Sequence, residues 1–370
     1  MLTYFVTIFI IAILGYMAQK NQMLLKSGLN ADSSANQLQR NIYKYEIACF
    51  LILSFVSGLR YHVGTDYGGY VTSFMTRSEM LWEHVKHFRE PGLGFIAYIS
   101  HILYDDYVVM FILVALLTVG LNVRTIAKYS DNVFLGIMLY IFIGAWHGSF
   151  NGMRQYLAAA VLFAGHRYIF ERDLKRYCLV IFIAMLFHRT ALVFLPVYWV
   201  VVPKHEVRNI FLIILGSIFM YYSYGILFEI MSELKGHDQT KYAYMQASVQ
   251  ILRVAVACAP ALLLFFVSPQ SHKDSEKSFY FKMLIVNAGF MVATSGSAYL
   301  ARIGVYSDIY ATIAFPKLID SFPKENRKVL SACIMLCYFI FWFWEVYSRD
   351  SLHYFHWIFE RNYYSPTIFY

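Results

Sequence analysis

The sequence predicts an all-α protein that crosses a membrane many times. Of its 370 residues, 59% are hydrophobic and only 15% are charged, whereas soluble domains are about half apolar and about a quarter charged. The apolar residues also occur in runs long enough for a helix to cross a bilayer core of about 30 Å. We therefore expect one transmembrane domain over residues 1–370, with roughly 10–14 transmembrane or half-membrane helices, and we exclude soluble enzyme folds.

Ten apolar runs are expected to form the spans. The first lacks the basic segment and the cleavage site of a signal peptide, so we take it as a membrane helix. The runs cover about 2–18, 43–59, 107–123, 133–147, 152–170, 210–228, 251–267, 279–300, 303–320 and 329–347. Two further segments fit less well: 93–104 is short, and 177–202 is interrupted by His188, Arg189 and Pro196. The second predicts either one broken helix or a hairpin of two short helices, of the kind tolerated beside protein or a water-filled cavity.

Basic residues predict the orientation of the chain. One alternate set of connections holds 16 Lys and Arg and the other holds 11, with Arg167, Arg253, Lys282 and Lys317 left out because they lie within the runs. The richer set, which includes the loop 19–42, is expected to be cytoplasmic, and loops 60–92 and 229–250 are expected outside. We therefore attribute the net charge of +8 to the loops that set the orientation of the chain in the membrane, and not to nucleic-acid binding. The five cysteines lie in apolar stretches and are expected to be small buried hydrophobes.

The first polar motif is RYHVGTDYGGY, residues 60–70, which follows the second apolar run. Its glycines permit sharp turns, and they hold Asp66 among Tyr67 and Tyr70. Carboxylates accept hydrogen bonds or protons from sugar hydroxyls, and aromatic rings stack on apolar sugar faces. The motif therefore favours a sugar site, with a turn that caps a helix as the structural alternative.

Two further motifs stand at expected helix starts. Glu90 precedes Pro91, which is typical of a helix N-terminus, so capping competes with a catalytic or acceptor-binding role. In NGMRQYLA, residues 151–158, Arg154 and Gln155 occupy the first turn. Because the guanidinium and the positive end of the helix dipole coincide there, the pattern favours phosphate binding over a lone snorkelling arginine.

The last two motifs place charge inside apolar sequence. His188 and Arg189 need polar partners, because burying them unpaired would cost several kcal/mol; a structural histidine and a general base or substrate orienter are the two interpretations. Arg302 lies between two apolar runs, near Tyr306 and Asp308. It is a candidate for substrate binding, and the structural alternative is a salt bridge to a nearby carboxylate. Under the loop-charge topology all five motifs lie outside, which predicts a site for an anionic, sugar-like, lipid-anchored substrate.

These motifs resemble those of the EpsG family, the Wzy-like polymerases of bacterial exopolysaccharide, capsule and O-antigen. The resemblance covers roughly residues 45–310, in order and spacing. It rests on R-x-x-x-G-T-D-Y-x-x-Y from Arg60, E-P-G from Glu90, N-x-x-R-Q-x-L-A from Asn151, H-x-x-A-L from His188 and A-R-x-x-x-Y from Ala301.

The resemblance implies a membrane fold related to the GT-C glycosyltransferases and a multi-pass enzyme of the bacterial inner membrane. Such a polymerase transfers a growing glycan from undecaprenyl diphosphate to the non-reducing end of a new lipid-linked repeat unit, at the periplasmic or outer face. The implied partners are undecaprenyl-diphosphate-linked repeat units, membrane lipids, a chain-length regulator and other polysaccharide assembly proteins, and not nucleic acid. No cofactor or metal is expected, although a divalent cation near Asp66, Asp105 and Asp106 stays open.

Each candidate residue then has an expected role. Arg154 and Arg302, joined by Arg60 or Arg189, would clamp the diphosphate and stabilise its growing charge. The general base is expected to be Asp66, then His188, then Glu90. The sugar contacts are expected from Tyr67, Tyr70, Asn151, Gln155 and Tyr306. Three competing functions stay open: a lipid-linked glycan ligase or other GT-C-type transferase, a lipid-linked oligosaccharide transporter, and a structural subunit of a synthase.

Overall fold

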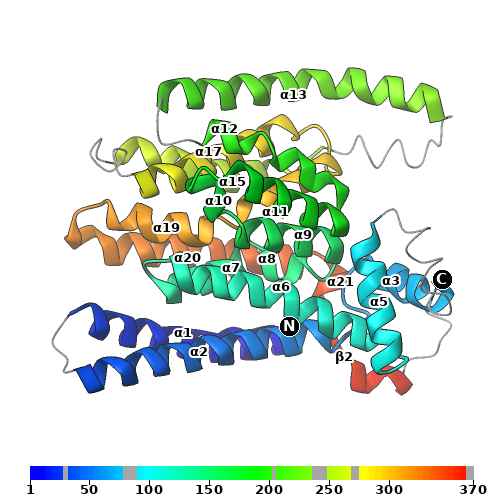
Figure 1. The fold of residues 1–370 in the computed structure, drawn as a ribbon, viewed down its shortest axis with the longest axis horizontal. Coiled ribbons are helices and arrows are strands. Elements are labelled where there is room, and N and C mark those ends of the chain that lie inside the picture. Colours follow the sequence, from blue (N-terminus) through cyan, green and yellow to red (C-terminus); the bar gives the residue numbers. More distant parts are fainter. Residues whose placement is uncertain (28–31, 78–89, 202–205, 236–247, 268–274, 364–370) are drawn as a thin grey trace.

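The computed structural model describes residues 1–27, 32–77, 90–201, 206–235, 248–267 and 275–363, and this part of the chain is almost entirely helical (Figure 1). Within these ranges, three helices are long and apolar enough to cross a membrane, and several shorter apolar helices accompany them. The three are α1 (Leu2–Lys26), α6 (Tyr107–Tyr129) and α20 (Lys324–Tyr347). The expected all-α polytopic membrane protein is confirmed.

The ten apolar runs all form helices. The remaining main ones are α2 (Asp32–Gly58), α7 (Val133–Phe142), α9 (Met153–Ala164), α13 (Glu206–Lys235), α15 (Ile251–Leu263), α17 (Ser275–Ala293) and α19 (Ala311–Asp320). Short turns of helix connect or extend them: α8 (Ala145–Gly148), α10 (Arg167–Phe170), η2 (Leu264–Phe266), η3 (Leu300–Gly304) and α18 (Val305–Asp308). Helices α1 and α2 continue well beyond their apolar runs, so most of the polar segment 19–42 is helical. Residues 78–89 and 236–247 of the expected outer loops lie outside the described residues.

The two segments that fit less well are short or broken helices. Helix α5 (Pro91–Leu103) has 13 residues, which span about 20 Å and therefore part of a bilayer. Helix α11 (Leu174–Phe187) ends where His188 is extended, and η1 (Arg189–Phe194) and α12 (Val197–Val200) follow. The break therefore falls at the polar pair His188 and Arg189, as the sequence predicts.

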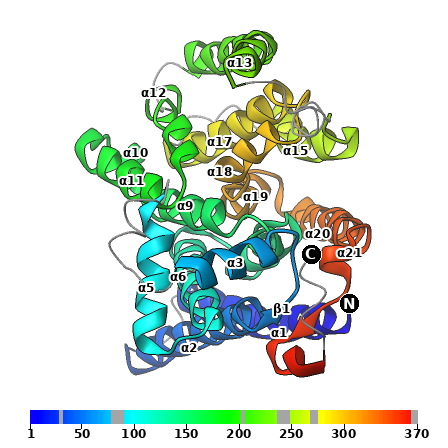
Figure 2. The ribbon, with the colours of Figure 1, turned by 90° about the vertical axis from the view of Figure 1, so that its right-hand side faces the viewer.

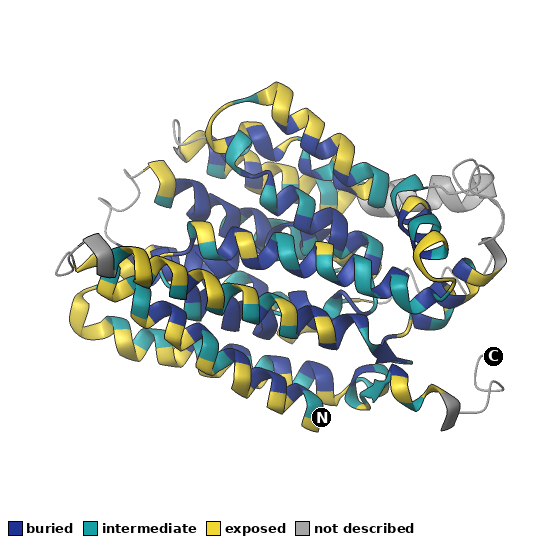
Figure 3. Cartoon of the chain, turned by 60° about the horizontal axis from the view of Figure 1, so that its bottom comes forward, coloured by how far each residue is buried: buried dark blue, intermediate teal, exposed yellow. Residues whose placement is uncertain are grey.

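The core lies among the central helices. Figure 3 shows buried residues along the middle of the bundle and exposed residues along its outer helices. The α1–α2 pair packs on α6 and α7, α9 contacts α6, α11 and α18, and α13 lies along α17 at one edge (Figure 1). Tyr4 of α1 packs edge-on against Trp146 and Trp342, with ring centroids 6.1 and 6.3 Å apart. Aromatic rings thus join the first and last long helices.

Distant parts of the chain meet at one end of the bundle, which we call the site end (right in Figure 1, towards the viewer in Figure 2). There β1 (Arg60–Tyr61) pairs antiparallel with β2 (His356–Trp357), and the amino group of Met1 donates to the His353 carbonyl at 3.1 Å. Helices α3 (Tyr67–Arg77) and α21 (Asp350–His353) and the turn η4 (Ile358–Tyr363) complete this end. The N-terminus of α1 and the region after α20 are thereby fixed beside the first polar motif.

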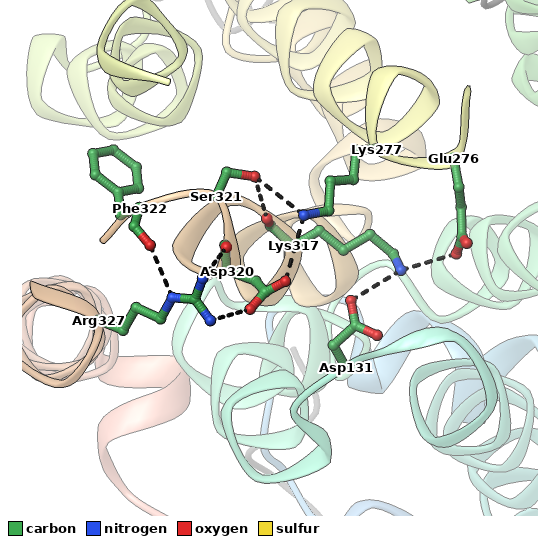
Figure 4. Close-up of polar contacts among 8 residues, drawn as sticks. All are labelled: Asp131, Glu276, Lys277, Lys317, Asp320, Ser321, Phe322 and Arg327. Atoms are coloured by element: carbon green, nitrogen blue, oxygen red, sulfur yellow. Dashed lines mark hydrogen bonds and ion pairs between the residues drawn. The ribbon is translucent and has the colours of Figure 1, made fainter. Parts of the chain in front are cut away.

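A separate polar network closes the opposite end (Figure 4). The Nζ of Lys317, a buried residue of α19, lies 3.1 Å from an Asp131 oxygen and 2.9 Å from a Glu276 oxygen. Nearby, Asp320 pairs with Arg327 and with Lys277. The network joins α17, α19 and α20 to the α6–α7 connection. It includes two of the basic residues, Lys277 and Arg327, from which the cytoplasmic side is predicted.

Candidate functional site

Glu90 connects three of the five polar motifs at the site end. One carboxylate oxygen lies 2.6 Å from Nη1 of Arg154. The other lies 2.7 Å from Nδ1 of His188 and accepts from the backbone N–H of Arg189 at 3.2 Å. Glu90 itself is buried, with 6% of its surface exposed. The motifs therefore converge on one carboxylate.

The local sequence explains this position. Glu90 is the N-cap residue of α5, and Pro91 sets the first helical residue. Gly92 lies so close to the end of α11 that an added Cβ would be 2.6 Å from a Phe187 ring carbon. Only glycine permits that approach. Because α11 ends next to it, the extended His188 and the backbone N–H of Arg189 face the carboxylate.

Glu90 is ionised at neutral pH. Its burial opposes ionisation, but the contacts with His188 and Arg154 and the Arg189 N–H outweigh that effect and hold the pKa of Glu90 below its ordinary value. The His188 contact has a hydrogen-bond distance, yet the ring N–H direction departs from hydrogen-bond geometry, so we describe it as a close ion-pair contact. A carboxylate with a lowered pKa is a weak base. Glu90 is therefore better suited to holding His188 and Arg154 than to taking a proton.

The first motif reaches this cluster through Tyr70. The Tyr70 hydroxyl lies near both Arg154 and Asp66, close enough for each to influence it electrostatically. Asp66 also accepts from the Thr65 hydroxyl at 3.3 Å, and the Thr65 backbone N–H donates to the Asn151 side chain at 2.6 Å. Asp66 and Asn151 are each about half-buried. The loop after β1 is thus attached to the residues that precede α9.

Gln155, Arg302 and Tyr306 adjoin the cluster on its other side. The Gln155 amide donates to the Arg302 backbone carbonyl at 2.7 Å. Tyr306 is fully buried and its hydroxyl is 2.8 Å from the hydroxyl of Thr190. The Arg302 side chain is exposed on the wall of a cavity.

This cavity has a volume of about 760 Å³, within the usual range of about 300–1,000 Å³ for ligand pockets. Several of the residues that line it come from the sequence motifs, among them Thr65, Asn151, Gln155 and Arg302. Arg253, Glu345 and Arg349, which belong to none of the five sequence motifs, also line the cavity and form a second charged cluster. The sequence did carry a signal for Arg253 and Glu345, because each lies within an apolar run and a charge in such a run is a functional candidate by default.

Arg60 and Tyr67 occupy other positions. Arg60 is 2% exposed; its guanidinium donates to the Ser57 and Phe150 carbonyls and lies 4.6 and 5.0 Å from the Phe111 and Phe150 ring centroids. The Tyr67 ring is buried and stacks on Phe111 at 4.8 Å. Neither lines the cavity. Both residues support the loop that carries Asp66.

The carboxylates considered for a divalent cation are engaged individually. Asp105 lies 2.7 Å from His101, while Asp106 caps α6 and lies 2.7 Å from Arg361. Within the described ranges, no three His, Cys, Asp or Glu side chains form a group suited to a metal ion.

A family model described as the EpsG family matches residues 44–359. No curated protein and no solved structure was found to match the chain. The matched range contains all five motifs and also α20 with Glu345 and Arg349. It therefore covers every side chain placed above on the wall of the cavity.

Proposed function

The chain belongs to the EpsG family of Wzy-like polysaccharide polymerases, and on that premise we propose that it transfers a growing glycan from undecaprenyl diphosphate to a new lipid-linked repeat unit. One observation carries the proposal. The cluster of Glu90, Arg154 and His188 lies next to Gln155, and Gln155 and Arg302 line a cavity of about 760 Å³ at one end of a membrane-spanning bundle. We expect phosphate-binding, sugar-binding and proton-accepting groups to act together there on a lipid-linked substrate.

In the proposed reaction, a hydroxyl oxygen of the acceptor sugar attacks the anomeric carbon of the donor chain. The bond between that carbon and the diphosphate oxygen breaks, and the bonding electrons leave with the diphosphate. The arginines Arg154 and Arg302 stabilise the negative charge that grows there, because guanidinium groups bind phosphate oxygens strongly. The hydroxyl proton passes to a general base.

We assign the base to His188. Its Nδ1 faces Glu90 at 2.7 Å, which leaves Nε2 as the basic nitrogen once Nδ1 carries the proton. Glu90 then acts as a positioning residue for both His188 and Arg154. To Asp66, the base that the sequence favoured first, we assign a hydrogen bond from the acceptor sugar; its contact with Thr65 beside the cavity supports this role.

Product sizing with purified protein tests this proposal. We expect the wild type to convert a lipid-linked repeat unit into a ladder of products, and His188→Gln to lower the rate by about 10²–10⁴, the usual contribution of a general base. Asp66→Asn should raise KM for the acceptor more than it lowers kcat. Arg327→Gln, at the opposite end, is the matched control and should leave the ladder unchanged.

Other outcomes would redirect the proposal. A ladder of normal rate from His188→Gln would contradict the assignment of the base, and a large loss of kcat in Asp66→Asn would move that role to Asp66. A single addition by the wild type would indicate a ligase. Absence of any product, combined with transport of the lipid-linked repeat, would indicate a transporter. Repeating the assay with a chelator tests whether a divalent cation takes part.

A further inference from the structure

A second charged cluster lies on the cavity wall, away from Glu90. Glu345, near the end of α20, bridges two arginines: one carboxylate oxygen accepts from Nε of Arg253 in α15, and the other lies 2.8 Å from Nη2 of Arg349. The carboxylate is only 10% exposed, and the arginine side chains are 32% and 34% exposed. Two guanidinium groups against one carboxylate leave an excess positive charge. Each arginine has five N–H donors, so donors remain for a ligand.

Further along α15 and α20, away from this charged cluster, the same cavity wall is apolar. Val256 and Ala257 follow Arg253 on α15, and Phe341 and Tyr338 precede Glu345 on α20; all four line the cavity. Their spacing of three and four residues places each set on one helix face. Glu345 and Tyr338 are seven residues apart, which is about 10 Å along the helix. The wall therefore changes from charged to apolar within about two helical turns.

Helices α15 and α20 are joined at two levels, one at each end of this wall. Arg253 and Glu345 form the outer contact. At the inner level Tyr338 donates its hydroxyl to the Val256 carbonyl at 3.4 Å. That carbonyl lacks its usual helical donor, because the residue four positions later is Pro260, which has no N–H. Ala257, which has a small side chain, follows Val256 and lines the cavity at the inner level.

The opposite faces of both helices are exposed and apolar. Ile251 of α15 is 86% exposed, and Leu336 and Ile340 of α20 are 58% and 57% exposed. Figure 2 shows both helices on the same side of the bundle. In a membrane these faces would contact lipid, so one layer of helices separates the cavity from the bilayer at this position.

We propose that Arg253 and Arg349 bind the diphosphate of the donor's lipid carrier inside the cavity that Arg302 also lines, in addition to the contacts proposed above for Arg154 and Arg302, and that the carrier's hydrocarbon chain leaves between α15 and α20. The inference rests on the proposed function. An anionic headgroup joined to a long apolar chain matches a wall that is positive at one level and apolar at the next. Asp308, which also lines the cavity, has one oxygen without a hydrogen-bond partner among the described residues. That oxygen suits a hydroxyl of the glycan attached to the diphosphate.

Binding measurements in lipid nanodiscs test the inference. The probes are undecaprenyl diphosphate without a glycan, phosphatidylglycerol and inorganic pyrophosphate. We expect the wild type to prefer undecaprenyl diphosphate to phosphatidylglycerol, and Arg349→Gln and Arg253→Gln/Glu345→Gln to weaken that binding at least about tenfold. The double variant removes both partners of a pair, so no buried charge is left unpaired. Arg327→Gln removes an arginine of similar exposure at the opposite end and should have no effect.

A second pair of variants tests the path of the chain. Ala257→Phe adds a large side chain to the cavity wall at the inner level, whereas Ala259→Phe adds the same group to the exposed face of α15. Ala257→Phe should weaken binding of undecaprenyl diphosphate and leave pyrophosphate binding unchanged, and Ala259→Phe should change neither. Wild-type affinity in the arginine variants, or equal affinity for phosphatidylglycerol, would overturn the inference.

The polymerisation assay separates this inference from the proposed function. If the wild type forms ladders and the Arg253, Arg349 and Ala257 variants keep its KM for the lipid-linked donor, the inference fails and the function stands. If the wild type binds undecaprenyl diphosphate through these arginines but forms no product, the polymerase proposal fails and the binding site stands.

Discussion

At the scale of single residues, the site depends on one buried carboxylate. Glu90 contacts a guanidinium, an imidazole and a backbone N–H, all within 3.2 Å. Removing any of these partners leaves a buried charge less well compensated, which is costly. The geometry of Arg154 and His188 is therefore expected to depend on Glu90 even if Glu90 takes no part in proton transfer.

The Glu90 and Arg154 pair can be measured directly. A double-mutant cycle with Glu90→Gln and Arg154→Gln should give a coupling free energy of about 1–2 kcal/mol, reduced from that of a buried pair because the Arg154 side chain is 39% exposed. The measurement is denaturant unfolding in detergent. A coupling near zero would mean that the contact contributes nothing to the fold.

The pH dependence of stability should also report on Glu90. Because the pKa of Glu90 in the folded protein is below its ordinary value of 4.5, its contribution is complete above that pH and is lost as the pH falls through the lowered pKa. The difference in thermal unfolding midpoint between wild type and Glu90→Gln should therefore be largest at neutral pH and shrink below about pH 4.5. A difference that stays constant on acidification would contradict this.

At the scale of elements, the site is built from interruptions of regular structure. The chain leaves α2 through β1 and a tight loop, α11 breaks at His188, and α9 begins directly after the Asn151 turn. These breaks release backbone groups that the site uses, such as the Arg189 N–H that binds Glu90. Interruptions of this kind are tolerated at membrane depth where protein or a cavity satisfies them.

Gly64 offers a test of the loop after β1. Its φ of +105° is unfavourable for other residues, and an added Cβ would be 2.6 Å from the Phe150 carbonyl oxygen. Gly64→Ala should therefore destabilise the protein by about 1–3 kcal/mol and disturb the contact between Thr65 and Asn151. Thermal unfolding and the polymerisation rate are the measurements.

Gly68→Ala is the matched control for that substitution. Gly68 lies in α3 with nothing within 4 Å of the added Cβ. Alanine is the better helix former by about 0.5–1 kcal/mol, so this variant should be as stable as the wild type or more so. Equal losses in both variants would show that Gly64 has no special role.

At the scale of the whole molecule, the two ends of the bundle carry different chemistry. The site end holds the cavity and its arginines, and the opposite end holds the network around Lys317 (Figure 4). Basic residues are expected to favour the cytoplasmic side. We therefore propose that the site end faces the periplasm or the exterior.

Cysteine labelling in intact cells tests this orientation. Ser348 and Ser27 are both exposed, and α1, which joins the two ends, has 25 residues and a length of about 38 Å. In a variant without the five native cysteines, a membrane-impermeant maleimide should label Ser348→Cys and leave Ser27→Cys unlabelled until the cells are opened. The reverse pattern would place the site end in the cytoplasm.

The sequence by itself determined the membrane class, the positions of the apolar helices and the break at His188. Hydropathy and helix interruption are local properties, so they can be read along the chain without knowledge of its partners. The motifs around Asp66, Glu90, Arg154, His188 and Arg302 stood out for the same reason, since charges are rare in apolar sequence.

Only the tertiary structure decided which of these groups meet. Glu90 is 64 residues from Arg154 and 99 from the backbone donor Arg189, and Arg253 is 92 residues from Glu345. Pairs at such separations depend on how the helices pack, and no local pattern encodes them. Packing also placed Arg60 and Tyr67 inside the protein, although their motif resembles a ligand site, because aromatic rings and guanidinium groups can satisfy one another there. The cavity and its second arginine cluster exist only once α15 and α20 lie side by side.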